Sequence, residues 1–360
     1  MAAAARARIA HLLRQLQRAA CQCPTHSHTY SQAPGFSPSG KTTDYAFEMA
    51  VSNIRYGAGV TKEVGMDLQN MGAKNVCLMT DKNLSQLPPV RIVMDSLVAN
   101  GINFKVYDNV RVEPTDRSFM EAIEFARKGA FDAYVAVGGG STMDTCKAAN
   151  LYASSPPNPI FRPAYQGSNP VSDIWAVHTL RIVAKYLKRA VRNPDDLEAR
   201  SNMHLASTFA GISFGNAGVH LCHGMSYPIS GLVKTYKAKD YNVDHPLVPH
   251  GLSVVLTSPA VFTFTAQMFP ERHLEMAEIL GADTRTARAA DAGPILADTL
   301  RKFLFDLDVD DGLAALGYSK ADIPALVKGT LPQERVTKLA PRPQSEEDLS
   351  ALFEASMKLY

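Results

Sequence analysis

The sequence lacks any run of about 18 consecutive apolar residues, the length that a membrane-spanning helix needs, and a membrane partner is therefore not expected. Its five cysteines are odd in number and show no disulfide framework, which is typical of a reducing compartment. The formal net charge of +2 indicates no particular class of partner, and no nucleic acid is expected. With 360 residues, 46% of them hydrophobic, the chain is long enough for two domains with separate cores.

Acidic residues are absent from residues 1–43, where the chain nevertheless carries several arginines, serines and threonines. Ile9, Leu12, Leu13 and Leu16 fall at helical spacing, and the arginines lie mostly elsewhere on the helical wheel. This pattern predicts a mitochondrial transit peptide over residues 1–43 and a location in the mitochondrial matrix. The alternative is a disordered tail without a targeting role.

A short run of metal-ligating residues, C-Q-C-P-T-H-S-H, lies inside this leader at residues 21–28. Its spacings are tighter than those of known structural zinc sites. We therefore interpret it as part of the leader and not as a metal site.

Strand-like and helix-like segments alternate after the leader, which predicts right-handed crossovers and a parallel sheet. The apolar strands end near turn residues and the helices end at glycines. The expected order is a strand at 75–80, a helix at 90–99, a strand at 104–107, a helix at 118–128 and a strand at 133–137.

Ligands of such a sheet bind at the carboxyl ends of its strands, where Asp81 and the run Gly138, Gly139, Gly140 and Ser141 lie. Three glycines allow the backbone to approach a phosphate, and Ser141 is expected to cap the following helix. The run is not G-x-G-x-x-G, so it also fits a simple turn after a strand. Asp81 is expected either to meet a ribose hydroxyl or to begin a loop.

The second half of the chain has helical periodicity from residue 174 onward. Small residues between Ala206 and Gly218 predict closely packed helices. The expected helices are 181–191, 196–210, 274–280, 290–304, 321–328 and 346–359.

Several motifs in this order identify a resemblance to the iron-containing (group III) alcohol dehydrogenases. They are A-V-S-N-I-R-Y-G (50–57), T-D-K-N-L (80–84), V-E-P-T (112–115), G-G-G-S-T-M-D-T-C-K (138–147), A-R-S-N-M-H-L-A-S-T-F-A-G-I-S-F-G-N-A-G (199–218) and P-H-G-L (249–252). The resemblance implies an α/β N-terminal dinucleotide-binding domain followed by an all-helical C-terminal domain. We expect these domains at 44–155 and 160–360.

The resemblance also implies two cofactors, NAD and a divalent metal, either iron or zinc. It implies small hydroxy acids and oxo acids as substrates, and a possible homo-oligomer. The cofactor residues it suggests are Asp81, the glycines and serine at 138–141, and Asp144. His223 and His250 match two of the family's four metal ligands. Tyr227 stands where many members carry a catalytic histidine, so proton handling here is expected to differ. The metal is expected to act as a Lewis acid on the substrate alkoxide, favouring hydride transfer to nicotinamide.

One large departure concerns the segment between the glycine run and His223. Members of the family carry there a T-T-x-G-T-G-S-E type loop and a D-x-x-x-H helix with the other two metal ligands. Only 76 positions separate Lys147 from His223, and neither motif occurs. The sequence around 155–159 therefore indicates a skipped internal segment, by splicing or by an error of the gene model.

Two substitutes for the missing ligands are considered. The first is His220, three residues before His223, which is expected on the same helix face. The alternative is that His220 only packs at a position where the family has a glycine. Asp244 and His245, which shortly precede His250, are the second substitute. A site of two histidines and one improvised ligand would bind metal weakly. Two hypotheses remain at this point: an oxidoreductase of the family, or a catalytically impaired relative of one.

Overall fold

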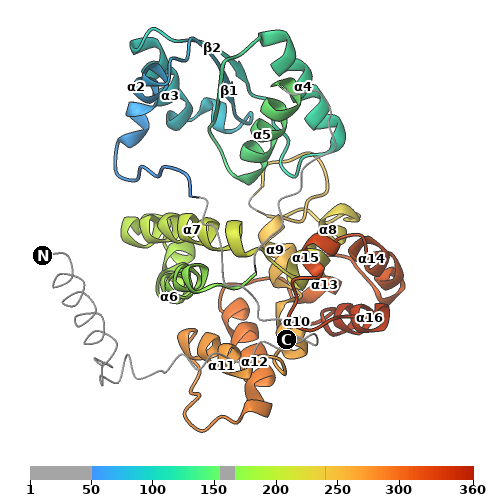
Figure 1. Cartoon of the computed structure of the whole chain (residues 1–360). Coiled ribbons are helices and arrows are strands. Elements are labelled where there is room, and N and C mark those ends of the chain that lie inside the picture. Colours follow the sequence, from blue (N-terminus) through green and yellow to red (C-terminus); the bar gives the residue numbers. More distant parts are fainter. Residues whose placement is uncertain (1–50, 155–166, 240) are drawn as a thin grey trace, which may run out of the picture. The chain divides into compact units, whose positions relative to one another are not determined.

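The computed structural model describes residues 51–154, 167–239 and 241–360, so the proposed leader and the junction near residue 155 lie outside the described residues. An α/β part comes first and a largely helical part follows, as the sequence predicts (Figure 1). No helix within these ranges is long and apolar enough to cross a membrane.

The α/β part contains a three-stranded parallel sheet in the order β2-β1-β3. Every strand expected from the sequence is present within one or two residues. The strands are β1 (Asn75–Met79), β2 (Asn103–Tyr107) and β3 (Ala133–Ala136). The helices between and around them are α2 (Val64–Asn70), α3 (Pro88–Ala99), α4 (Asp116–Gly129) and α5 (Gly140–Ser154).

Helices cover both faces of this sheet (Figure 1), because β1 carries apolar side chains on both of its faces. Val76 and Leu78 pack with buried residues of α2 and α3. Cys77 and Met79 pack on the other face with buried residues of α4 and α5. This arrangement holds the carboxyl ends of β1 and β3, and the loops that follow them, at one edge of the sheet.

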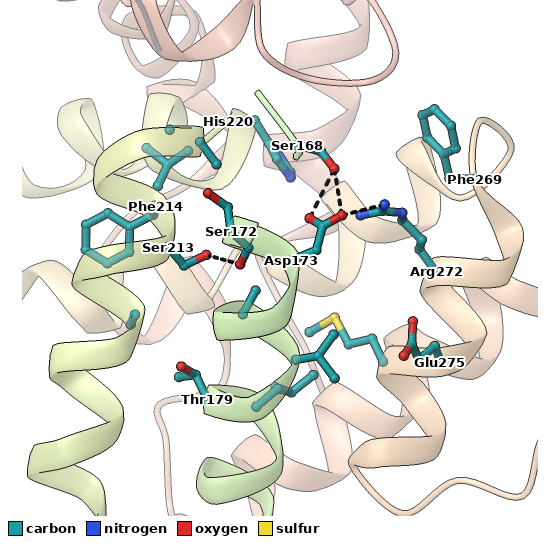
Figure 2. Close-up of a pocket in the computed structure, with 18 of the residues that line it drawn as sticks. Ser168, Ser172, Asp173, Thr179, Ser213, Phe214, His220, Phe269, Arg272 and Glu275 are labelled. Carbon is teal, nitrogen blue, oxygen red and sulfur yellow. Dashed lines mark hydrogen bonds and ion pairs between the residues drawn. The ribbon is translucent and has the colours of Figure 1, made fainter. Parts of the chain in front are cut away.

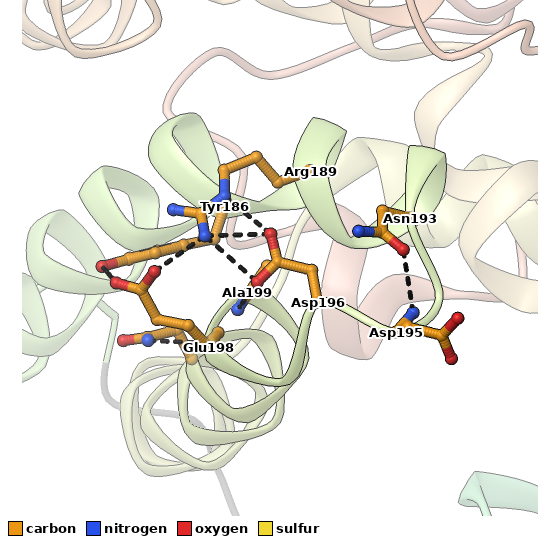
Figure 3. A network of polar contacts seen from close by, with 8 residues as sticks. Tyr186, Arg189, Asn193, Asp195, Asp196, Glu198 and Ala199 are labelled. Atoms are coloured by element: carbon orange, nitrogen blue, oxygen red, sulfur yellow. Dashed lines mark hydrogen bonds and ion pairs between the residues drawn. The ribbon is translucent and has the colours of Figure 1, made fainter.

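The helical part begins with a long hairpin of α6 (Pro170–Arg192) and α7 (Leu197–Ala217). A polar network closes its corner: the Arg189 guanidinium contacts the carboxylates of Asp196 and Glu198 at 2.9 and 2.7 Å, and Asp196 also caps α7 (Figure 3). Tyr186 donates a hydrogen bond to Glu198 at 3.0 Å. These contacts join the end of α6 to the start of α7.

The remaining helices build a second core around α8, α10, α14 and α16. Gly224 of α8 and Gly329 of α14 allow a close approach, since an added Cβ would lie 2.6 Å from Thr337 and from Pro228 respectively. The helices are α8 (Leu221–Gly231), α9 (His250–Val255), α10 (Ser258–Thr265), α11 (Pro270–Ile279), α12 (Ala292–Phe305), α13 (Gly312–Ala315), α14 (Ile323–Thr330), α15 (Glu334–Thr337) and α16 (Glu346–Ala355).

Three details differ from the expectations. Helix α6 begins at Pro170, eleven residues before the expected start, because Asn169 caps it and proline is favourable in a first turn. Helix α16 ends at Ala355, because the chain then turns and bonds to residues 313 and 314. The close helix packing expected between Ala206 and Gly218 holds at Ala206, which is buried against α6, but not at Gly211 and Gly215, which are exposed with no atom within 4 Å of an added Cβ.

Candidate functional site

A cleft of about 1210 Å³ lies at the carboxyl edge of the sheet and against α8 and α9. Almost every candidate residue from the sequence lines it. These are Asp81, Gly139, Gly140, Ser141, Asp144, His223, Tyr227 and His250. Gly138 is the exception, and the structure thus brings the proposed cofactor and metal residues to one place.

The glycine run has two kinds of position. A Cβ on Gly138 would lie 2.3 Å from the hydroxyl oxygen of Thr142, so only glycine fits there. Gly139 and Gly140 have open space where a Cβ would be, and α5 begins at Gly140. Their backbone is therefore free of side-chain cover next to a helix N-terminus, which is the environment that favours a phosphate.

Ser141 does not cap α5 as expected, because it is already the second residue of that helix. Its hydroxyl oxygen instead accepts a hydrogen bond of 3.0 Å from the backbone N–H of Glu113. Asp144 is exposed on α5, with one carboxylate oxygen 3.7 Å from the Lys147 ammonium.

Asp81 begins the loop after β1. Its Oδ1 accepts hydrogen bonds of 2.9 Å from the backbone N–H groups of Asn83 and Leu84. The loop interpretation therefore agrees with the structure, and the second carboxylate oxygen, Oδ2, is not used by these two bonds.

His223 and His250 approach each other with ring centroids 5.3 Å apart. His223 lies in the first turn of α8, and His250 is the first residue of α9. Burial, assisted by the neighbouring His250 and His220, lowers the pKa of His223 from 6.5 to about 4. At neutral pH this imidazole is uncharged, which is the form that binds a metal.

The substitute ligands considered from the sequence do not complete this pair. His220 is the residue before α8, with φ of −129° and ψ of −139°, so the expected common helix face is wrong. It lines a different cavity, where its ring makes an edge contact with Phe262. His245 lines the cleft, but its Nδ1 lies 3.1 Å from exposed Asp244.

No group of three or more His, Cys, Asp or Glu side chains suited to a metal ion exists within 51–154, 167–239 and 241–360. Residues 155–166 contain none of these four residue types. The described side chains around His223 and His250 therefore do not fit the four-ligand metal site of the family.

Glu113 was not identified from the sequence as a functional residue, although it belongs to the quoted V-E-P-T motif. Its backbone has a positive φ of 52°, which is unfavourable for a residue with a side chain. Its carboxylate accepts the backbone N–H of His250 at 3.1 Å, and its own N–H bonds to Ser141. Glu113 thus contacts both Ser141, beside the glycine run, and His250 of the histidine pair. No sequence motif alone indicates this role.

Tyr227 lies four residues after His223 on α8, and its side chain is 37% exposed. Both residues line the same cleft, as their helical spacing requires. The structure therefore places a phenol beside the histidine pair.

The fold and this cleft agree with the comparisons to known proteins. The iron-containing alcohol dehydrogenase model matches residues 52–182, and the C-terminal model of the same family matches residues 164–357. The chain belongs to the iron-containing alcohol dehydrogenase family. This family is enzymatic, and it implies a nicotinamide dinucleotide and a divalent metal.

Two relatives are 71% identical to this chain over 467 aligned positions, covering 100% of each chain: the mitochondrial hydroxyacid-oxoacid transhydrogenases of Pongo abelii and Homo sapiens. Their name denotes an oxidoreductase, and it confirms the predicted mitochondrial location. The 467 positions exceed the 360 residues of this chain by 107. Because both chains are covered from end to end, the extra positions are internal, as the skipped segment predicts.

Among solved structures, a 1,3-propanediol oxidoreductase is similar with a TM-score of 0.76 and 21% identity, over 86% of this chain and all of that one. At this identity the likeness concerns the fold. It confirms the predicted order of an α/β part and a helical part.

Proposed function

We propose that this chain retains the nucleotide-binding part of a hydroxyacid-oxoacid transhydrogenase and catalyses that reaction much more slowly than a complete relative. The observation that carries the proposal is the His223–His250 pair, which no third metal-ligating side chain of the described residues joins. The glycine run beside it remains suited to a dinucleotide.

The nucleotide would be held mainly by backbone groups. The N–H groups at the start of α5, from Gly140 onward, would receive the pyrophosphate, and the open positions at Gly139 and Gly140 let it approach. The loop that Asp81 begins would flank the adenosine side, because Asp81 lines the same cleft.

The proposed substrates are 4-hydroxybutyrate and 2-oxoglutarate. A bound nicotinamide supplies both a hydride acceptor and a hydride donor, so 4-hydroxybutyrate is oxidised to succinate semialdehyde while 2-oxoglutarate is reduced to 2-hydroxyglutarate. Both substrates are carboxylates, and Arg111 is the one arginine or lysine among the described residues that line the cleft. Its guanidinium donates to the backbone oxygen of Glu113 at 3.0 Å, which keeps a positive charge at the cleft wall.

The rate is limited by the metal half-site. Two imidazoles provide half the ligands of the family's site, and each missing ligand removes both a bond and preorganisation. The loss of an electrostatic stabiliser of this kind typically lowers the rate on the order of a thousandfold.

Exposed apolar surface on α7 is consistent with this proposal. Phe214 of α7 is 49% exposed, and Gly211 and Gly215 on the same helix have no neighbour within 4 Å of an added Cβ. Helix α7 therefore lacks part of the packing that its small residues would permit, and the stability of the chain is expected to be lower than that of a complete relative.

The test measures metal content and turnover on the same preparation. The purified chain is saturated with zinc or ferrous iron and gel-filtered, its metal is measured by elemental analysis, and 2-hydroxyglutarate is quantified after incubation with both substrates. The human transhydrogenase is the reference, and the His223→Ala variant is the background. We expect less than one metal per chain and turnover about a thousandfold below the reference. One tightly held metal per chain with turnover similar to the reference would contradict the proposal.

A further inference from the structure

Glu113 makes three hydrogen bonds at the wall of the cleft, and each uses a different group of the residue. Its backbone N–H donates to the hydroxyl oxygen of Ser141 at 3.0 Å, and its backbone oxygen accepts from the guanidinium of Arg111 at 3.0 Å. Its carboxylate oxygen Oε1 accepts from the backbone N–H of His250 at 3.1 Å. All four residues line the cleft, so this network reaches from Ser141, beside the glycine run, to the histidine pair.

The backbone of Glu113 has a conformation that its own sequence disfavours. Its φ of 52° lies in the left-handed region, where the Cβ of a residue other than glycine is crowded, and a residue before proline, here Pro114, is restricted further. The other described residues of this kind, Ala130 and Asp308, follow helices α4 and α12, where a left-handed residue commonly ends a helix. Glu113 precedes a helix instead, so its hydrogen bonds are what hold this conformation.

The side chain of Glu113 therefore acts as an anchor for the backbone. While the carboxylate is bound to the His250 N–H, the loop after β2 keeps its positive φ, and the Glu113 N–H stays directed at the Ser141 hydroxyl. Without the carboxylate the strain of this loop conformation is no longer offset, so the conformation is populated less. Ser141 is the second residue of α5, whose N-terminal N–H groups form the proposed phosphate seat.

We propose that Glu113 is a positioning residue for the dinucleotide: hydrogen bonds from His250 through Glu113 to Ser141 hold the start of α5 in the orientation that receives the pyrophosphate. Glu113 acts through Ser141 and does not itself contact the phosphates, since its carboxylate is bound to His250 and would repel them. The inference rests on the proposed function, because it concerns a dinucleotide bound at the glycine run.

The first test compares the NAD affinity of the full chain with that of three Glu113 variants, by calorimetric titration at pH 7. Glu113→Ala should bind NAD about fivefold more weakly, the effect of one hydrogen bond. Glu113→Gln keeps an acceptor oxygen and should stay within about twofold of the unaltered chain. Glu113→Gly lacks the side chain but adopts a positive φ without strain, so it should bind NAD more tightly than Glu113→Ala. A glutamate that only filled space would give the opposite order, with the glycine variant weakest.

A double variant tests whether Glu113 acts through Ser141. Ser141→Ala removes the acceptor of the Glu113 N–H, so the loss caused by Glu113→Ala should not add to the loss caused by Ser141→Ala. The double variant should therefore bind NAD within about twofold of Ser141→Ala alone. ADP-ribose carries the pyrophosphate without the nicotinamide, and Glu113→Ala should weaken its binding by the same factor as that of NAD.

Asp173→Ala is the matched control for a general loss of stability. Asp173 also carries a carboxylate that accepts hydrogen bonds, from the Ser168 hydroxyl at 3.1 Å and from the Arg272 guanidinium at 2.7 Å (Figure 2). It lines a separate cavity of about 760 Å³ between α6, α7 and α11, and it does not line the cleft. Asp173→Ala should lower the urea midpoint of unfolding, as Glu113→Ala does, and leave the NAD affinity unchanged.

The Gly139→Asp variant separates this inference from the proposed function, because it alters the phosphate seat itself. No NAD binding by the unaltered chain, or the same affinity in Gly139→Asp, would contradict the proposed seat and the role of Glu113 with it. Where Gly139→Asp does abolish binding, four results would each overturn the role of Glu113 alone. They are an unchanged affinity in Glu113→Ala, a glycine variant weaker than the alanine variant, additive losses in the double variant, and an equal loss in Asp173→Ala. A loss for NAD without one for ADP-ribose would also overturn it.

Discussion

The carboxylate of Glu113 accepts a hydrogen bond of 3.1 Å from the backbone N–H of His250, across 137 residues of sequence. Glu113 comes from the loop after β2, and His250 begins α9. The same glutamate bonds through its own N–H to Ser141, next to the glycine run. A single residue in an unfavourable backbone conformation therefore connects the proposed phosphate loop with the histidine pair, and strain of this kind concentrates at functional sites.

The Glu113–His250 bond leads to a prediction about stability. Glu113→Ala removes the acceptor but keeps the positive φ, and should lower the free energy of unfolding by about 0.5–1.5 kcal/mol. Glu113→Gln retains an acceptor oxygen and should lose less. Glu113→Gly also loses the acceptor but relieves about 1 kcal/mol of backbone strain, so it should be more stable than the alanine variant. Urea unfolding measures all three, and equal midpoints for alanine and glutamine would contradict the role assigned to the carboxylate.

A second prediction concerns the glycine run. Gly139→Asp should abolish NAD binding, because its carboxylate would occupy and repel the phosphate position. An added Cβ at Gly139 meets no atom within 4 Å, so the variant should fold normally. Gly139→Asn introduces a side chain of equal size without the charge, so it distinguishes electrostatic repulsion of the phosphate from steric blockage. It should retain more affinity for NAD than Gly139→Asp. Calorimetric titration with NAD measures both, and unchanged affinity in Gly139→Asp would show that the phosphate lies elsewhere.

The strands, the parallel sheet and the cleft residues could be predicted because each depends on local sequence. Short apolar runs indicate β1 to β3, and strand ends are where such sheets bind ligands. The positions of His220 and Glu113 could not be predicted in this way. His220 precedes α8 because the chain turns at Gly218, whose φ is 87°, and only the backbone path shows that turn. The contact of Glu113 with His250 joins distant segments whose pairing no periodicity specifies. The start of α6 could have been predicted from the sequence, since Asn169 followed by Pro170 is a usual helix beginning.

A third prediction concerns pH. Burial lowers the pKa of His220 from 6.5 to about 4, so between these two values the unfolded chain binds a proton that the folded chain excludes. Stability from this group is fully present above pH 6.5 and is lost as the pH falls toward 4, with an upper limit of roughly 3 kcal/mol. His220→Phe should remove this part of the dependence. Urea unfolding at pH 7 and pH 4.5 should show a smaller difference for the variant than for the unaltered chain, and an equal difference would contradict the buried, neutral state of His220.

The last prediction tests the histidine pair by completing it. Tyr227 lies one helical turn after His223 on α8, and both line the cleft with His250. Tyr227→His would place two imidazoles at i and i+4, a spacing that presents both to one ion on one helix face. With His250 as a third ligand, the variant should bind Zn²⁺ at least tenfold more tightly than the unaltered chain, measured by competition with a fluorescent chelator. The gain should vanish when His223→Ala is added, because the pair is then broken. A gain that survives in the double variant would mean that zinc binds away from His223, and that the cleft does not gather these side chains around one ion.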